Sequence, residues 1–246
     1  MIAISVVELN AIVCLAMLVV ASAMDVRKRE ISDKVWIISF IVGLTIIVVG
    51  LFADHNYALM LQQHQYIVRY ALSIGITAPL AYIAYRGWLF GGADAKALVV
   101  ISVILPFYEM RYSIHGIPAL TILTNACMLT LVHILHNISR NTIAVIKGRD
   151  IFAGFESETR FRKVLAFMIG FIAKRPRGYL FPIEESKDDG KRVFTLSPRA
   201  YSDYVHESSR DIWVTPALPF IVYMTIGFLL MLYVGDVLAY TLHSIW

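Results

Sequence analysis

Two aspartates stand at the edges of long apolar runs in this chain, where an ionisable group is costly unless it is paired or takes part in chemistry. Asp25 follows the first apolar run, and Asp94 opens the run Ala95–Phe107. Two carboxyl groups a few ångströms apart cannot both ionise easily, so such a pair shares one proton. The charged member can deprotonate a water, while the protonated member donates to a carbonyl oxygen. That chemistry would hydrolyse a peptide bond without a covalent intermediate.

The residues before Asp94 favour a close approach of the backbone to a substrate. Gly91 and Gly92 precede Ala93 and the acid. Glycine permits positive φ and close backbone contact, and a helix N-terminus favours an anion. Two structural alternatives stay open: the glycines could only cap a loop, and each aspartate could only pair with basic residues next to it in sequence.

The composition points to a membrane protein that would hold these acids on helices. The chain of 246 residues is 58% hydrophobic and 16% charged, whereas soluble domains carry about 25% charged residues. A bilayer crossing needs ~20 apolar residues. We therefore predict an all-α membrane protein with six transmembrane helices, near residues 2–24, 35–53, 66–85, 95–107, 117–135 and from Trp213 to about 233.

The basic residues predict the orientation of these helices. The loop between the first two helices contains Arg27, Lys28, Arg29 and Lys34, whereas residues 54–65 contain no Lys or Arg. Since short cytoplasmic loops collect positive charge, we expect this first loop in the cytoplasm. The N-terminus and the C-terminus are then outside, and both aspartates lie at the cytoplasmic face. The net charge of +4 follows from the same rule, and we expect no nucleic-acid partner.

A polar stretch interrupts the apolar runs and predicts a small α+β cytoplasmic domain between the fifth and sixth helices. The predicted division is residues 1–138 for five helices with the aspartates, 139–211 for this domain and 212–246 for the last helix. Ser157 is expected to cap a helix that reaches Ala173. Residues 179–183 and 192–196 flank an Asp-Gly pair, which predicts a β-hairpin.

Two motifs in this order resemble the GxGD intramembrane aspartyl proteases, specifically the prepilin peptidases and the archaeal preflagellin peptidases. The first is Asp25-Val-Arg-Lys-Arg-Glu-Ile-Ser-Asp33, and the second is Gly91-Gly-Ala-Asp-Ala-Lys96. The resemblance implies that Asp25 and Asp94 are the catalytic pair, with Lys96 and Arg27 at the family's basic positions. Ala93 departs from the pattern, which has glycine there, so either this position has negative φ or the loop geometry differs.

The resemblance also implies a substrate. The implied activity is removal of the short basic leader of archaellin (preflagellin) or type IV pilin-like precursors at the cytoplasmic membrane face. The sequence itself suggests no metal or other cofactor. A further hypothesis is that the two aspartates stand apart at rest and that the substrate closes the pair. A proton- or ion-coupled transporter and a non-catalytic membrane scaffold are the alternative functions, since intramembrane acids also bind ions.

Overall fold

The computed structural model describes residues 5–87, 91–173, 180–186, 191–195, 211–216 and 219–245. The chain divides into two compact units. Unit 1 comprises Met1–Leu129 and Pro219–Trp246, and unit 2 comprises Thr130–Leu218. The division falls inside the long helix α6 (Pro118–Ile146).

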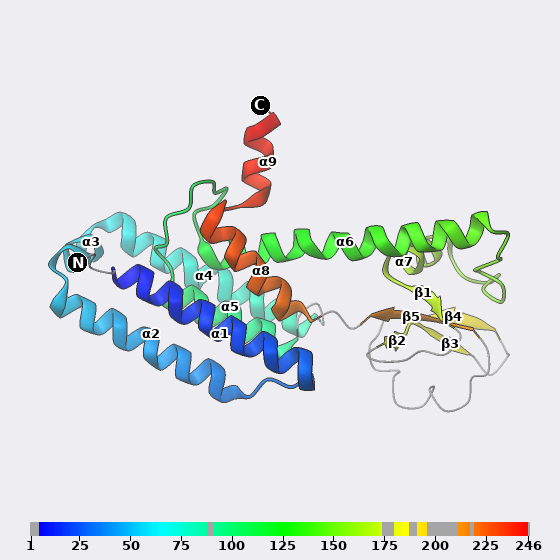
Figure 1. Ribbon diagram of the computed structural model, residues 1–246, viewed down its shortest axis with the longest axis horizontal. Helices are drawn as coiled ribbons and strands as arrows, with labels where there is room; N and C mark the ends of the chain where they lie inside the picture. Colours follow the sequence, from blue (N-terminus) through cyan, green and yellow to red (C-terminus); the bar gives the residue numbers. More distant parts are fainter. Residues whose placement is uncertain are drawn as a thin grey trace. The chain divides into compact units, whose positions relative to one another are not determined.

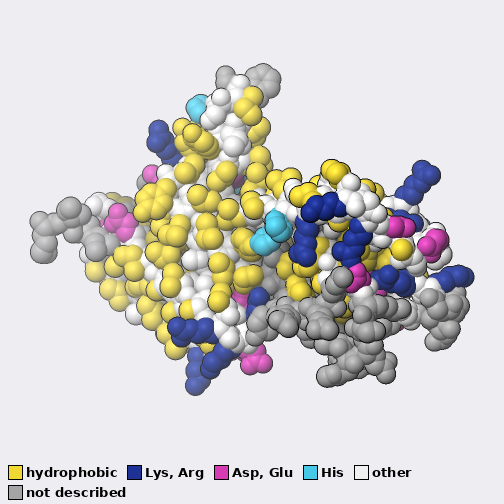
Figure 2. All heavy atoms as spheres, turned by 45° about the vertical axis from the view of Figure 1, so that its right-hand side comes forward, with side chains coloured by type: hydrophobic (Ala, Val, Ile, Leu, Met, Phe, Trp, Pro, Cys, Tyr) yellow, Lys and Arg dark blue, Asp and Glu magenta, His cyan; other side chains and the backbone are white. Residues whose placement is uncertain are grey.

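Unit 1 is built of helices, of which several are long and apolar enough to cross a bilayer (Figure 1). Four helices pass that test in the described part of the chain, and α8 and α9 together form a fifth candidate span, bent by 49°. Hydrophobic side chains cover much of the visible surface of these helices, as expected where lipid replaces water (Figure 2). The chain is therefore a multi-pass membrane protein. Besides the first part of α6, the helices are α1 (Val6–Lys28), α2 (Asp33–Ala53), α3 (His55–Gln62), α4 (His64–Arg86), α5 (Gly92–Ile104), α8 (Phe220–Tyr233) and α9 (Val237–Ile245).

Small residues and buried hydroxyl groups hold the helices of unit 1 together. Gly227 of α8 lies so close to α6 that an added Cβ would come within 2.7 Å of a main-chain oxygen. The hydroxyl groups of Ser22 and Thr225 are 2.7 Å apart and join α1 to α8. Ser73 of α4 donates to the main chain of α5 at 2.9 Å. With little hydrophobic drive between helices in lipid, such contacts do much of the packing. Helix α5 packs against α1, α2 and α4.

Unit 2 combines the end of α6 with a short helix and five strands. Asn141 of α6 is buried, and its amide donates to two main-chain carbonyls at the C-terminal end of α7, those of Phe167 and Gly170, each at 2.8 Å. Its elements are α7 (Arg160–Ile169), the antiparallel sheet β1-β5-β2 and the antiparallel pair β3-β4, with strands β1 (Phe171–Ala173), β2 (Leu180–Pro182), β3 (Glu184–Ser186), β4 (Arg192–Phe194) and β5 (Ile212–Pro216).

The predicted start of the last helix is wrong, because Trp213 lies in strand β5. Trp213 is fully buried, stacks on Phe152, and donates from its indole to the Ile151 carbonyl at 3.0 Å. Its main-chain N–H donates to the buried Glu184 carboxylate at 2.8 Å. The apolar run that predicted a membrane entry is therefore the core strand of a small sheet, and the helix begins only at Phe220.

Other element boundaries shift for local reasons. The first helix continues to Lys28, so Asp25 lies within its last turns and not beyond its end. The helix predicted from Ser157 begins at Arg160, because Thr159 provides the capping oxygen for the N–H of Arg162. Strand β4 pairs with β3, whereas the predicted partner was the preceding segment, residues 179–183. Most of the predicted Asp-Gly turn, residues 187–190, lies outside the described residues.

Candidate active site

Asp25 lies in the last turns of α1, beside the positive charge of Arg29. The helix ends at Lys28, and Arg29 follows in the left-handed conformation with φ 57°. Its main-chain N–H donates to the Asp25 carbonyl at 3.0 Å, and its charge acts on the partly exposed Asp25 carboxyl group. Arg27 is exposed in the last helical turn. The resemblance places Arg27 at the family's basic position, whereas the charge that acts on Asp25 is that of Arg29, four residues after the acid.

Asp94 lies in the first turn of α5 and turns back toward the loop before it. Its Oδ2 accepts a hydrogen bond from the main-chain N–H of Gly91 at 2.9 Å, and the residue is only 8% exposed. An added Cβ at Gly91 would stand 3.1 Å from that same oxygen. Gly91 therefore lets a buried carboxyl group approach the backbone at the positive end of a helix.

The position where the family pattern has glycine needs none here. Ala93 is inside α5 and has negative φ, since Arg29 is the only described residue other than glycine with positive φ. Gly92 is also helical, and an added Cβ there would meet the Tyr85 ring at 3.6 Å, an ordinary contact. The first of the two alternatives for Ala93 is therefore the correct one.

The two aspartates come from distant parts of the chain and lie close enough to interact electrostatically. The charge of Asp25 acts on the Asp94 carboxyl group, and α1 packs against α5 within unit 1. Like charges at short range in a partly dry site favour a shared proton. The arrangement can therefore present one ionised and one protonated carboxyl group to a water and a carbonyl.

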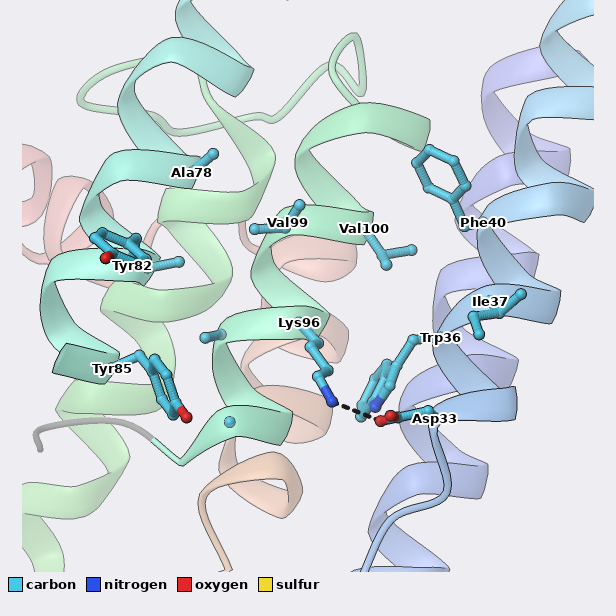
Figure 3. Close-up of a pocket in the computed structure, with 13 residues that line it drawn as sticks. Asp33, Trp36, Ile37, Phe40, Ala78, Tyr82, Tyr85, Lys96, Val99 and Val100 are labelled. Carbon is cyan, nitrogen blue, oxygen red and sulfur yellow. Dashed lines mark hydrogen bonds and ion pairs between the residues drawn. The ribbon is translucent and has the colours of Figure 1, made fainter.

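Lys96 pairs with Asp33 and not with the acid two residues before it. Its Nζ lies 2.5 Å from Asp33 Oδ1, which joins the start of α5 to the start of α2 (Figure 3). Residues two apart on a helix point in different directions, so Lys96 and Asp94 serve different surfaces. No local pattern in the sequence reveals a partner for Lys96 from another helix.

The described residues include no group of three or more His, Cys, Asp or Glu side chains placed to hold a metal ion. The side chains that converge at this end of unit 1 are the two carboxylates, the basic Arg29 and the Asp33–Lys96 pair.

Comparisons with known proteins match most of the chain. Residues 12–135 match the type IV leader peptidase family, and residues 163–237 match the type II C-terminal region of the archaeal A24 peptidases. The chain is similar to the preflagellin peptidase of Methanocaldococcus jannaschii, with 26% identity over 93% of this chain and 94% of that protein. It is 25% identical to the preflagellin peptidase of Methanococcus maripaludis, over 89% of this chain and 92% of that protein.

The first family match covers about half of the chain and includes the loop, both aspartates and the basic residues discussed above. The second covers all five described strands of unit 2 and all of α8. The two matches and the relatives extend over both units, so the chain belongs to the type IV leader peptidase family.

Proposed function

We propose that this membrane peptidase removes the short basic leader of preflagellin, the archaellin precursor, or of type IV pilin-like precursors, with Asp25 and Asp94 as its catalytic pair. The relatives that match nearly the whole chain are named preflagellin peptidases. The observation that carries the catalytic assignment is that Asp25 and Asp94 lie on two helices, α1 and α5, that pack against each other inside the region matched by the peptidase family.

The mechanism follows from the shared proton of the pair. The ionised carboxylate takes a proton from a water, whose oxygen attacks the carbonyl carbon of the scissile peptide bond, and the protonated carboxyl group donates to the carbonyl oxygen. The tetrahedral diol then collapses, the C–N bond breaks, and the amine leaves with a proton from the pair. The two groups titrate as one unit, so the proton belongs to the pair.

Each neighbouring group has a part in this mechanism. The Gly91 N–H holds the Asp94 carboxylate by a hydrogen bond of 2.9 Å and limits its rotation. The charge of Arg29 favours the ionised form of Asp25. Substrate binding is expected to draw the ends of α1 and α5 together and align the pair, which extends the hypothesis of an open resting site.

We further propose the topology that the basic residues predict. It counts α5 as a short sixth crossing and the bent pair of α8 and α9 as the last one, with both chain ends outside. Arg27, Lys28, Arg29 and Lys34 around the α1–α2 connection support a cytoplasmic site. The domain near residues 139–211 then faces the cytoplasm, where a precursor leader is accessible before export.

The test is cleavage by the full chain reconstituted in lipid vesicles with a leader-bearing archaellin precursor. Asp25→Asn and Asp94→Asn should each abolish cleavage, because neither variant can form the proton-sharing pair. Asp54→Asn is the matched control: it changes an acid at the other end of α2, where asparagine can also accept the Tyr57 N–H. Cleavage that survives either catalytic substitution would refute the proposed mechanism, and solute flux without cleavage would favour the transporter.

A further inference from the structure

A largely apolar groove of about 630 Å³ opens between α2, α4 and α5, beside the candidate active site (Figure 3). Several residues that line the groove are exposed on the surface of unit 1, including Ile37, which is 56% exposed, and Tyr82, which is 62% exposed. A volume of this size lies within the range of ligand pockets in proteins. The residues used below are Asp33, Trp36, Ala78, Tyr82, Ala95 and Lys96.

One end of the groove is polar and contains a hydrogen-bond donor without an acceptor. Trp36 is 4% exposed, and its indole Nε1 has no hydrogen-bond partner among the described residues. The Asp33–Lys96 pair lies at this same end (Figure 3). Buried donors are almost always paired, so an unpaired indole N–H in a groove wall points to a ligand with an acceptor oxygen.

The polar end is next to the catalytic turn. Gly92, Ala95 and Lys96 line the groove and flank Asp94 in the first turns of α5. Whatever fills the groove therefore runs alongside the helix that carries one of the two acids. A substrate segment in the groove would lie next to the helical turn that carries Asp94, and a lipid chain held there would occupy the same space.

We propose that this groove binds the apolar segment of the substrate next to the cleaved bond, and that the Trp36 N–H donates to a main-chain carbonyl of that segment. The assignment rests on the proposed function and adds the place where the substrate docks. A peptide complements both parts of the groove, because its apolar side chains can contact the groove walls and its main-chain carbonyl can accept a hydrogen bond at the polar end. A phospholipid also carries apolar chains and ester carbonyls, so a lipid is the competing occupant, and it would give no crosslink to the precursor in the experiment below.

The Asp33–Lys96 ion pair lies over the polar end of the groove, and a bound substrate segment would displace it. Both side chains are half or more exposed, at 68% for Asp33 and 50% for Lys96. An exposed pair of this kind contributes little to stability, so a bound segment can displace it at low cost. The pair is therefore a contact that substrate binding replaces, and its loss should leave the fold of unit 1 unchanged.

Steady-state kinetics in vesicles test the proposal, with a leader-bearing precursor as substrate. Trp36→Phe keeps an aromatic ring but removes the donor, so KM should rise about threefold to tenfold, as expected for one neutral hydrogen bond, with kcat nearly unchanged. Ala78→Trp fills the groove from α4 and should raise KM at least about tenfold. The matched control is Ala16→Trp, which fills a separate apolar furrow between α1 and α2 and should leave KM unchanged.

A binding measurement separates this proposal from the proposed function. A photoreactive p-benzoylphenylalanine replaces the exposed groove residue Tyr82 in an Asp94→Asn background and should crosslink to the precursor. The same group at Ile12, exposed on α1, should not. Crosslinking equal at both positions, or an unchanged KM in both Trp36→Phe and Ala78→Trp, overturns the groove assignment. Continued cleavage by Asp94→Asn instead refutes the catalytic pair and leaves the groove assignment to be judged on crosslinking alone.

Discussion

Gly91→Ala is the substitution that most directly tests how Asp94 is held. The backbone of Gly91, with φ −67° and ψ 157°, suits alanine, so the change introduces no backbone strain. The new Cβ would stand 3.1 Å from Asp94 Oδ2, closer than methyl groups normally approach an oxygen. The carboxylate must therefore move by a few tenths of an ångström and weaken its 2.9 Å hydrogen bond to the Gly91 N–H.

The expected loss follows from the strength of that bond. A hydrogen bond to a charged group contributes about 1.5–3 kcal/mol, and Asp94 is too buried for water to replace it. If alignment of the carboxylate contributes to the transition state by the same amount, kcat should fall about tenfold to a hundredfold. The substrate groove is not altered, so KM should stay near the wild-type value.

Gly92→Ala is the matched control, one residue further along. Its Cβ would meet the Tyr85 ring at an ordinary 3.6 Å, and alanine is preferred to glycine inside a helix by about 0.5–1 kcal/mol. The assay is single-turnover cleavage of a precursor in vesicles, with thermal unfolding to verify folding. Equal rates for the two variants would show that the approach of Asp94 to Gly91 has no part in catalysis.

Three further predictions concern stability. Asn141→Ala should destabilise unit 2 by about 2 kcal/mol, because two buried carbonyls near the end of α7 lose their donor; earlier proteolysis of residues 130–218 is the readout. Gly227→Ala should destabilise unit 1 by about 1–3 kcal/mol, whereas Gly75→Ala, with no atom within 4 Å of its added Cβ, should not; equal unfolding midpoints would contradict this packing. Burial lowers the pKa of His115 below 6.5, although the charge of Asp236 acts in the opposite direction. The stabilising contribution of neutral His115 is therefore present above pH 6.5 and is lost as pH falls through the lowered pKa, so the wild-type melting temperature should fall more on acidification than that of His115→Gln.

Composition and local motifs were enough to predict the membrane class, the order of the long helices and the two acids. An apolar run of about twenty residues has few alternatives to a spanning helix, which is why the predicted ends of α2 and α4 lie close to the observed ones and those of α1 differ by about one turn. The glycines before Asp94 predict a close approach of the backbone to a substrate, which stays a prediction, while in the structure Gly91 approaches the Asp94 carboxylate. These features depend on neighbours in sequence, which a sequence displays directly.

Only the tertiary structure decided the secondary structure of short apolar runs and the partners of residues that are far apart in sequence. A buried strand and the start of a buried helix have the same apolar character, so Trp213 was assigned to the membrane until its contacts with Phe152 and Glu184 placed it in a sheet. The partner of Lys96 depends on how α2 packs against α5. The groove and its unpaired indole exist only because three helices leave a space between them. Interactions between residues far apart in sequence have no local signature, because packing selects them after the helices have formed.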